Sequence, residues 1–155
     1  MKLRIIALGS KMPEWIAAGY AEYARRMPRD YALELVELKP EARDRGRTVS
    51  QLLAAEAIRI DAATTGCMRI ALDEHGSAWT SRMLADRLGR WRDEARDVAF
   101  VIGSADGLDP ALKRTADERL ALSALTLPHG LVRVLLAEQL YRAVALLTGH
   151  PYHRD

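Results

Sequence analysis

The stretch DVAFVIGSADG, residues 97–107, decides the fold class of this 155-residue chain. After Asp97 the residues are apolar as far as Ile102, which is typical of a strand covered on both faces. The segment GSADG at 103–107 then supplies the small residues of a turn at the carboxyl end of that strand. Strands buried on both faces occur mainly in parallel sheets between layers of helices, so the stretch predicts an α/β protein.

Outward from this strand, the sequence alternates between strand and helix patterns. We expect further strands at 2–8, 31–38, 68–72 and 119–122, and helices at 13–26, 48–63, 79–91, 109–117 and 131–148. Thr48 and Gln51 have the spacing of a capping box at the start of one helix. The charged loop 39–47 is expected to be mobile. The alternation over short links predicts a mostly parallel, doubly wound sheet in a single domain, 1–155.

Three segments are expected to meet where such a sheet binds its ligand. Ligands of open parallel sheets bind beyond the carboxyl ends of the strands, and here these ends lead into 73–77, 103–107 and 122–129. The glycine-containing segment lacks the Lys-Ser/Thr pair of a phosphate loop. The last segment is mostly apolar, so its chemistry would be backbone amides and carbonyls around a flat ring, with Leu125 and Leu127 as walls. Such a pocket suits an adenine better than a phosphate.

The composition is that of a soluble protein with one thiol. Hydrophobic residues make up 49% of the chain, but no apolar run approaches the roughly 18 residues that a membrane span needs. The first residues, MKLRIIALG, resemble a strand more than a signal peptide, so we expect a cytoplasmic protein with no membrane partner. Cys67 alone excludes an internal disulfide framework, and the spacing of the four His residues predicts no metal site.

The charge of the chain is only weakly informative about nucleic acid. The formal net charge is +2, from 23 basic and 21 acidic residues, but a basic footprint need only be local. The excess of Arg either serves phosphate contacts or reflects the codon usage of a GC-rich genome.

The helix expected at 131–148 is apolar around nearly its whole circumference. A helix that is hydrophobic on all sides is buried on all sides, and a second subunit would cover the face that the sheet does not, so the helix predicts a homodimer. The alternative is a central helix buried within one subunit. Glu138 and Arg142 are four residues apart and can pair. Inside such a helix, the pair is either a structural salt bridge or holds the interface or a substrate phosphate.

Five motifs carry a resemblance to a known family. They are KMPEW, IGSADG, SALTLPH, LVRVLLAEQLYRA and the C-terminal HPYHR. With them, the whole chain resembles the small RlmH-type ribosomal RNA large subunit methyltransferases of the SPOUT superfamily. The resemblance implies an α/β knot fold, in which the C-terminal segment is threaded into a trefoil knot, and a homodimer. It also implies S-adenosylmethionine as cofactor and methylation of N3 of a pseudouridine in 23S rRNA of the assembled 70S ribosome.

The resemblance also implies a cofactor site. Carried over by motif, the cofactor-binding residues are Leu72, Gly103, Leu122, Ser123, Ala124, Leu125, Thr126 and Leu127. One position departs from the family, which commonly has Gly-Gly-x-x-Gly where this chain has Ser104 after Gly103. A Ser is tolerable there unless the position needs a positive φ.

The catalytic residues are expected near the C-terminus. Methyl transfer to a ring nitrogen releases a proton, and the candidate bases are His153 and Glu138, the latter with Arg142. His153 would otherwise stack on the flipped base, and Glu138 would otherwise only orient Arg142. RNA contacts are expected from Arg133, Arg154 and Tyr152, whose ring either stacks on a base or packs against the partner subunit. The tail of one subunit is expected to complete the pocket of the other.

Two rival functions stay open on the sequence alone. One is methylation of another RNA, such as tRNA, by the same type of enzyme. The other is a non-catalytic, dimeric ribosome-associated factor with a vestigial pocket. With a net charge of only +2 and no separate RNA-binding domain, recognition is expected to need the preformed surface of the ribosome.

Overall fold

The computed structural model describes residues 1–44 and 46–154, with only the backbone of His153. Its centre is a five-stranded sheet in the order β2-β1-β4-β3-β5, in which all neighbouring strands are parallel. The strands are β1 Leu3–Leu8, β2 Leu33–Leu38, β3 Met68–Ala78, β4 Val98–Ile102 and β5 Glu118–Ala121. Every residue of β4 is buried, as expected for a strand covered on both faces. The prediction of a parallel α/β sheet is confirmed.

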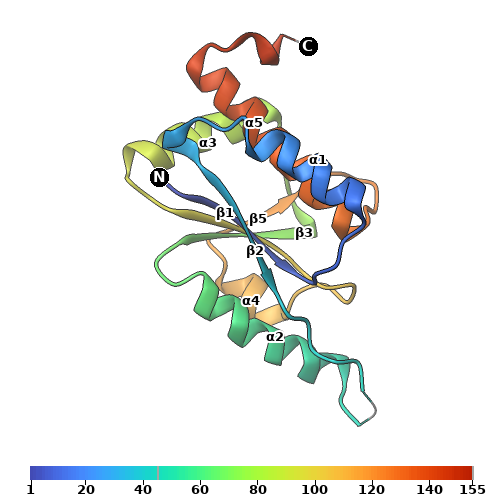
Figure 1. Ribbon diagram of the computed structural model, residues 1–155. Coiled ribbons are helices and arrows are strands. Elements are labelled where there is room, and N and C mark those ends of the chain that lie inside the picture. Colours follow the sequence, from blue (N-terminus) through green and yellow to red (C-terminus); the bar gives the residue numbers. More distant parts are fainter. Residues whose placement is uncertain (45, 155) are drawn as a thin grey trace.

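Helices cover both faces of this sheet (Figure 1). One face carries α1 Glu14–Ala24, α3 Ser81–Asp93 and α5 His129–Thr148, and the other carries α2 Val49–Ala63 and α4 Pro110–Thr115. Two short 3₁₀ turns, η1 Arg29–Tyr31 and η2 Pro151–His153, complete the described elements. Alternate strand residues serve the two cores: Ile5 packs in the cluster with α3 and α5, and Ile6 in the cluster with α2 and α4.

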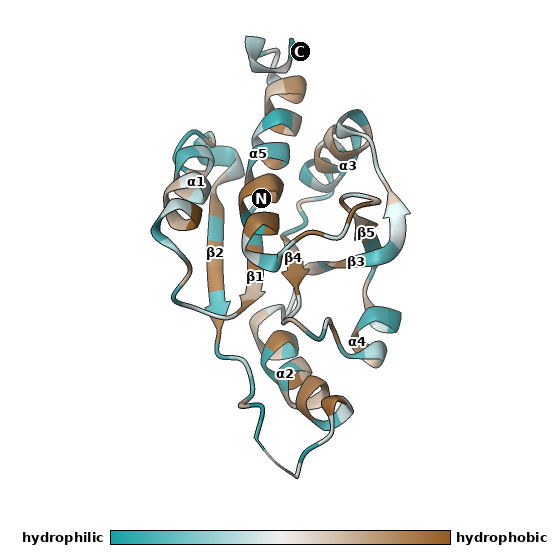
Figure 2. Ribbon diagram, turned by 90° about the vertical axis from the view of Figure 1, so that its right-hand side faces the viewer, coloured by the Kyte–Doolittle hydropathy of each residue, from teal (hydrophilic) through white to brown (hydrophobic). Residues whose placement is uncertain are grey.

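The central helix α5 lies between α1 and α3 on its face of the sheet (Figure 2). Small residues allow the close approach on both sides. A Cβ at Gly19 of α1 would lie 3.2 Å from Val134, and one at Gly89 of α3 would lie 3.2 Å from Leu147. The helix ends at Gly149, which adopts the left-handed conformation with φ 74°. One subunit therefore already buries much of α5, as in the alternative to a dimer, whereas Leu135 remains 37% exposed.

Local signals set the ends of the helices on the other face. Thr48 and Gln51 form the predicted capping box at the start of α2. Asp109 caps α4 by accepting hydrogen bonds from the backbone amides of Ala111 and Leu112.

The strand β3 is longer than the sequence predicts. It was expected to end at residue 72 and to lead into a polar loop at 73–77, but it continues to Ala78 through an irregularity in its pairing with β5. Leu72 and Ser77 both pair with Leu120, so residues 73–76 bulge out of the ladder. A Cβ at Gly76 would lie 2.8 Å from the carbonyl carbon of Arg119, so only glycine lets the bulge approach β5 so closely.

Candidate functional site

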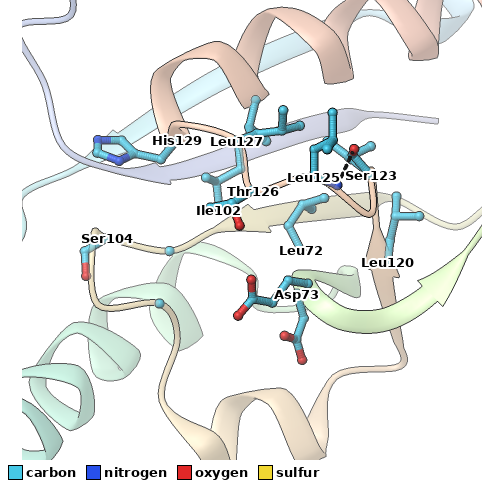
Figure 3. Close-up of a pocket in the computed structure, with 15 residues that line it drawn as sticks. Leu72, Asp73, Ile102, Ser104, Leu120, Ser123, Leu125, Thr126, Leu127 and His129 are labelled. Atoms are coloured by element: carbon cyan, nitrogen blue, oxygen red, sulfur yellow. Dashed lines mark hydrogen bonds between the residues drawn. The ribbon is translucent and has the colours of Figure 1, made fainter.

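A pocket of about 180 Å³ lies beyond the carboxyl ends of β4 and β5, beside the bulge in the middle of β3. The segments 73–77, 103–107 and 122–129 all contribute to it, and the first turn of α5 closes one side (Figure 3). Its lining residues are Leu72, Asp73, Glu74, Ile102, Gly103, Ser104, Gly107, Leu120, Leu122, Ser123, Leu125, Thr126, Leu127, His129 and Val132. Of the predicted cofactor residues, Ala124 does not line the pocket, whereas the other seven do.

The glycine segment after β4 forms a tight turn at the edge of this pocket. The amide of Gly107 donates a 2.9 Å hydrogen bond to the carbonyl oxygen of Ser104. A Cβ at Gly103 would lie 2.5 Å from the carbonyl oxygen of Gly107, and Gly107 itself has φ 85°. The turn therefore needs glycine at 103 and 107. Ser104 is not among the positive-φ residues, so a side chain is accommodated there without backbone strain.

The side chain of Ser104 ties the turn to a buried carboxylate. Its hydroxyl donates a 3.0 Å hydrogen bond to Glu56 of α2, which is 2% exposed. Arg43 donates to both, at 2.8 Å to the carboxylate of Glu56 and at 2.8 Å to the hydroxyl of Ser104. Arg43 also contacts Asp106 at 3.2 Å. The charged loop before α2 is thus joined to the pocket by ion pairs and hydrogen bonds.

The pocket combines apolar walls with two carboxylates. Leu72 and Ile102 lie on one side, and Asp73 lies below them in Figure 3. The side chain of Asp73 is 6% exposed, accepts a 3.1 Å hydrogen bond from the amide of His75 and lies 3.9 Å from Nζ of Lys113. Walls of this kind can hold a flat ring, and the carboxylates can accept hydrogen bonds from hydroxyls or neutralise a cation.

The segment after β5 lines the pocket with Leu122, Ser123, Leu125, Thr126 and Leu127. The hydroxyl of Ser123 accepts a 2.9 Å hydrogen bond from the amide of Leu125, which fixes the first bend of the segment (Figure 3). Leu125 itself is 75% exposed. An exposed leucine beside a pocket can pack against a bound ligand or against a second protein surface.

The predicted catalytic residues lie far from this pocket in the same chain. His129 begins α5, whereas Arg142 lies thirteen residues further, roughly 20 Å along the helix axis. The C-terminal turn folds onto that distal part of α5 and projects away from the sheet (Figure 1). One chain therefore does not bring its own Glu138, Arg142 and tail to its own pocket.

The distal residues form a network of their own. Arg142 pairs with Glu138 at 2.7 Å, as the spacing predicts, and lies 4.9 Å from the ring centre of Tyr152. The hydroxyl of Tyr152 donates a 2.9 Å hydrogen bond to Glu138. Burial, followed by the hydrogen bond to Glu138, raises the pKa of Tyr152. The side chain of His153 lies outside the described residues, and Arg154 is exposed.

Arg133, predicted to contact RNA, is buried inside the chain at 2% exposure. Its guanidinium donates to Glu37 at the end of β2 at 2.7 Å and to the carbonyl oxygen of Gly9 after β1 at 3.0 Å. Its partners in this chain are therefore protein groups, and it fixes the start of α5 against two strand ends.

The chain matches a known protein family over almost its whole length. A family model described as "Predicted SPOUT methyltransferase" matches residues 1–153. The chain belongs to the SPOUT methyltransferase family. Among curated relatives, proteins named ribosomal RNA large subunit methyltransferase H from Nitrosospira multiformis and Paraburkholderia xenovorans are 62% and 58% identical, each over 99% of both chains.

Two solved structures share this fold at a lower sequence identity than the curated relatives. A probable methyltransferase from Bordetella pertussis is 21% identical with a TM-score of 0.61, over 92% of this chain and 95% of that one. A probable methylase family protein from Haemophilus influenzae is 16% identical with a TM-score of 0.64, over 97% of this chain and 69% of that one.

Several pocket residues of this SPOUT protein were not singled out from the sequence. They are Ile102, Leu120 and Val132, whereas Asp73, Glu74, Gly107 and His129 lie in the three segments that the sequence predicted to meet at the ligand site. The signal for Asp73 and Glu74 was their position directly after a buried strand. In the part of the chain that the structure describes, no group of His, Cys, Asp and Glu is arranged to hold a metal ion, and no helix is long and apolar enough to cross a membrane.

Proposed function

We propose that the protein transfers a methyl group from S-adenosylmethionine to N3 of a pseudouridine in 23S rRNA of the assembled 70S ribosome. The observation that carries this proposal is the 62% identity, over 99% of both chains, to a protein named ribosomal RNA large subunit methyltransferase H. The pocket at the strand ends supports it, because it has the apolar walls and polar groups of a small-molecule site. The whole chain, 1–155, acts as one methyltransferase domain in the cytoplasm, where ribosomes are.

The pocket fits the proposed cofactor in its chemistry. Leucines such as Leu72 and Leu127 would enclose the adenine, whose edge would meet backbone groups of 122–127. The carboxylates of Asp73 and Glu74 suit the hydroxyls and the positive charge of the cofactor. When bound, S-adenosylmethionine supplies an electrophilic methyl group on its sulfonium. The protein's contribution is mainly to position the two reactants in line.

A homodimer would bring the distal residues to a pocket. The pocket of one chain holds about 180 Å³, below the roughly 300–1,000 Å³ of typical ligand sites, so a further wall is expected. The tail of a second subunit, with Tyr152 and Arg154, would supply that wall and contacts to RNA. The exposed Leu135 of α5 supports an interface along this helix. We also propose the C-terminal trefoil knot that is implied by the resemblance to RlmH-type enzymes.

The proton on N3 needs an acceptor, and the contacts of Glu138 favour His153. Oε1 of Glu138 accepts from Arg142 and Tyr152, and Oε2 accepts from Gln139 at 2.7 Å. Both carboxylate oxygens are therefore engaged by donors of this chain. We assign proton transfer to His153 and assign Glu138 and Arg142 to holding the tail in place. Arg133 fixes the pocket-facing turn of α5 through Glu37, rather than binding RNA in its observed pose.

The test is transfer of labelled methyl groups from S-adenosylmethionine to ribosomes from a strain that lacks this enzyme. Assembled 70S particles, separated subunits and tRNA are assayed side by side. Label on 23S rRNA of 70S particles alone supports the proposal. Label on tRNA alone would support the rival RNA substrate. Absence of S-adenosylmethionine binding would support a non-catalytic ribosome-associated factor.

A further inference from the structure

A second hollow, of about 590 Å³, lies beside the pocket on the outer side of β5. The β3 bulge, β5 with the residues before it, α4 and α3 form its walls, and we call it the edge groove. Its lining residues are His75, Gly76, Ser77, Trp79, Arg87, Lys113, Arg114, Ala116, Asp117, Glu118 and Arg119. In Figure 2 the outer end of β3 and α4 lie on this side of the sheet and are coloured largely as hydrophilic. Nothing in the proposed catalytic site uses this groove.

We propose that the edge groove binds the phosphate backbone of rRNA while the neighbouring pocket methylates it. This inference rests on the proposed function and names where the substrate is held. Four basic and two acidic side chains line the groove, so its charge is positive although the whole chain carries only +2. Phosphate contacts of this kind supply most of the sequence-independent affinity of proteins for nucleic acid.

The ion pairs within the groove show which of its basic side chains are available to bind phosphate. Arg87 is engaged by Glu118 at 3.0 Å, and Lys113 lies 3.9 Å from Asp73. Arg114 and Arg119 are exposed, and among the residues that the structure describes neither has a hydrogen-bond or ion-pair partner. Two unpaired guanidiniums in one hollow provide the bidentate donors that suit phosphate oxygens.

The aromatic residue of the groove explains why it would bind phosphate rather than bases. The guanidinium of Arg87 lies 4.0 Å from the ring centre of Trp79, and the other parts of the ring pack against the core and near Trp91. Arg87 therefore already stacks on the half-buried ring, which leaves Trp79 a poor stacking platform for a base. The groove presents cations and backbone groups, which would hold RNA without reading its sequence.

The bulge of β3 connects the edge groove to the pocket. Asp73 and Glu74 line the pocket, and the next residues of the same bulge, His75 to Ser77, line the groove. The Asp73–Lys113 contact joins the two sites. RNA held along the groove would therefore pass next to the pocket, and Gly76 makes this possible because it lets the bulge lie against Arg119.

The test compares the double variant Arg114→Ala and Arg119→Ala with a matched control, Arg82→Ala and Arg90→Ala. The control arginines are exposed on α3 and do not line the groove, so both variants remove the same charge. Methylation of 70S ribosomes is measured between 50 and 200 mM salt, together with S-adenosylmethionine binding. We expect the groove variant to raise KM for ribosomes about tenfold and to reduce the salt slope by about two, one for each lost phosphate contact. Its kcat and its cofactor affinity should stay unchanged, as should all values of the control.

Three outcomes would overturn the inference. Equal KM values for the groove variant and the control would show that the groove is not used. A raised KM with an unchanged salt slope would indicate a contact with ribosomal protein rather than phosphate. A raised KM that is accounted for by lost cofactor affinity would show that the two arginines act through the pocket and not through RNA. If the wild-type protein does not methylate ribosomes, the proposed function fails, and cosedimentation of the same variants with 70S particles still tests the groove by itself.

Discussion

The hydroxyl of Ser104 lies 3.0 Å from the carboxylate of Glu56, and this contact joins the pocket turn to the helix beneath it. The resemblance to RlmH-type enzymes implies a glycine at position 104, where this chain has Ser104. Because Arg43 donates to both partners, the side chain adds two hydrogen bonds that a glycine lacks. The side chain of Ser104 therefore fixes the turn to Glu56 and Arg43.

Removing either partner of the Ser104–Glu56 contact should destabilise the protein, and the loss of Glu56 should cost more. We expect Ser104→Gly to lower the free energy of unfolding by about 1 kcal/mol, since Glu56 keeps its bond to Arg43. Glu56→Ala should cost about 2–3 kcal/mol, because it leaves Arg43 without its buried partner, although Arg43 is partly solvated. Urea unfolding measures both. The exposed Glu94→Ala is the control and should change stability by less than about 0.5 kcal/mol. Equal effects of all three variants would contradict the linkage.

Adding one methyl group to the pocket turn should weaken cofactor binding. In Gly103→Ala the new Cβ would meet the carbonyl oxygen of Gly107 at 2.5 Å, so the turn must open. We expect S-adenosylmethionine affinity to fall at least tenfold by calorimetry, while the circular dichroism spectrum stays native. Leu125→Ala, at an exposed position on the same pocket, is the milder companion and should weaken binding only a few-fold. Normal affinity of Gly103→Ala would place the cofactor elsewhere.

Changes in the tail should affect the chemical step. We expect His153→Asn to lower kcat by about 10²–10⁴-fold and to remove one limb of the pH–rate profile, as for loss of a general base. Tyr152→Phe removes the hydrogen bond to Glu138 and should lower kcat less, with the pH profile unchanged in shape. Single-turnover methylation of ribosomes measures both. A His153→Asn enzyme with a wild-type pH profile would show that another group takes the proton.

Tyr20 should make the protein sensitive to alkaline pH. Burial, with a smaller contribution from Glu34, raises the pKa of Tyr20 to about 12. The neutral phenol is therefore favoured in the folded state, so its contribution to stability is complete below pH 10 and is lost as the pH rises from 10 to 12. The buried hydroxyl has no hydrogen-bond partner among the described residues, so Tyr20→Phe should not destabilise the protein at pH 7. Unfolding curves from pH 7 to 12 should show a shallower alkaline decline in the variant, and an identical decline would refute this assignment.

The sequence predicted those parts of the structure that depend on local pattern. The apolar run of β4, the turn at 103–107 and the segment after β5 lie where the strand-end rule places a pocket. The β3 bulge was missed because its polar residues look the same in a loop and in an exposed strand end. The burial of Arg133 was missed because its partners, Glu37 and Gly9, are far away in the sequence and give no periodic signal.

The contact between Arg133 and Gly9 spans 124 positions of the chain, and it has a consequence for the timing of folding. Contacts of such separation are formed late, because a long loop must close before they repay its entropy. During synthesis, the ends of β1 and β2 lack their contact with Arg133 until α5 has emerged from the ribosome. A nascent chain that stops before residue 133 therefore lacks the side chain that fixes the pocket-facing turn of α5 to the ends of β1 and β2.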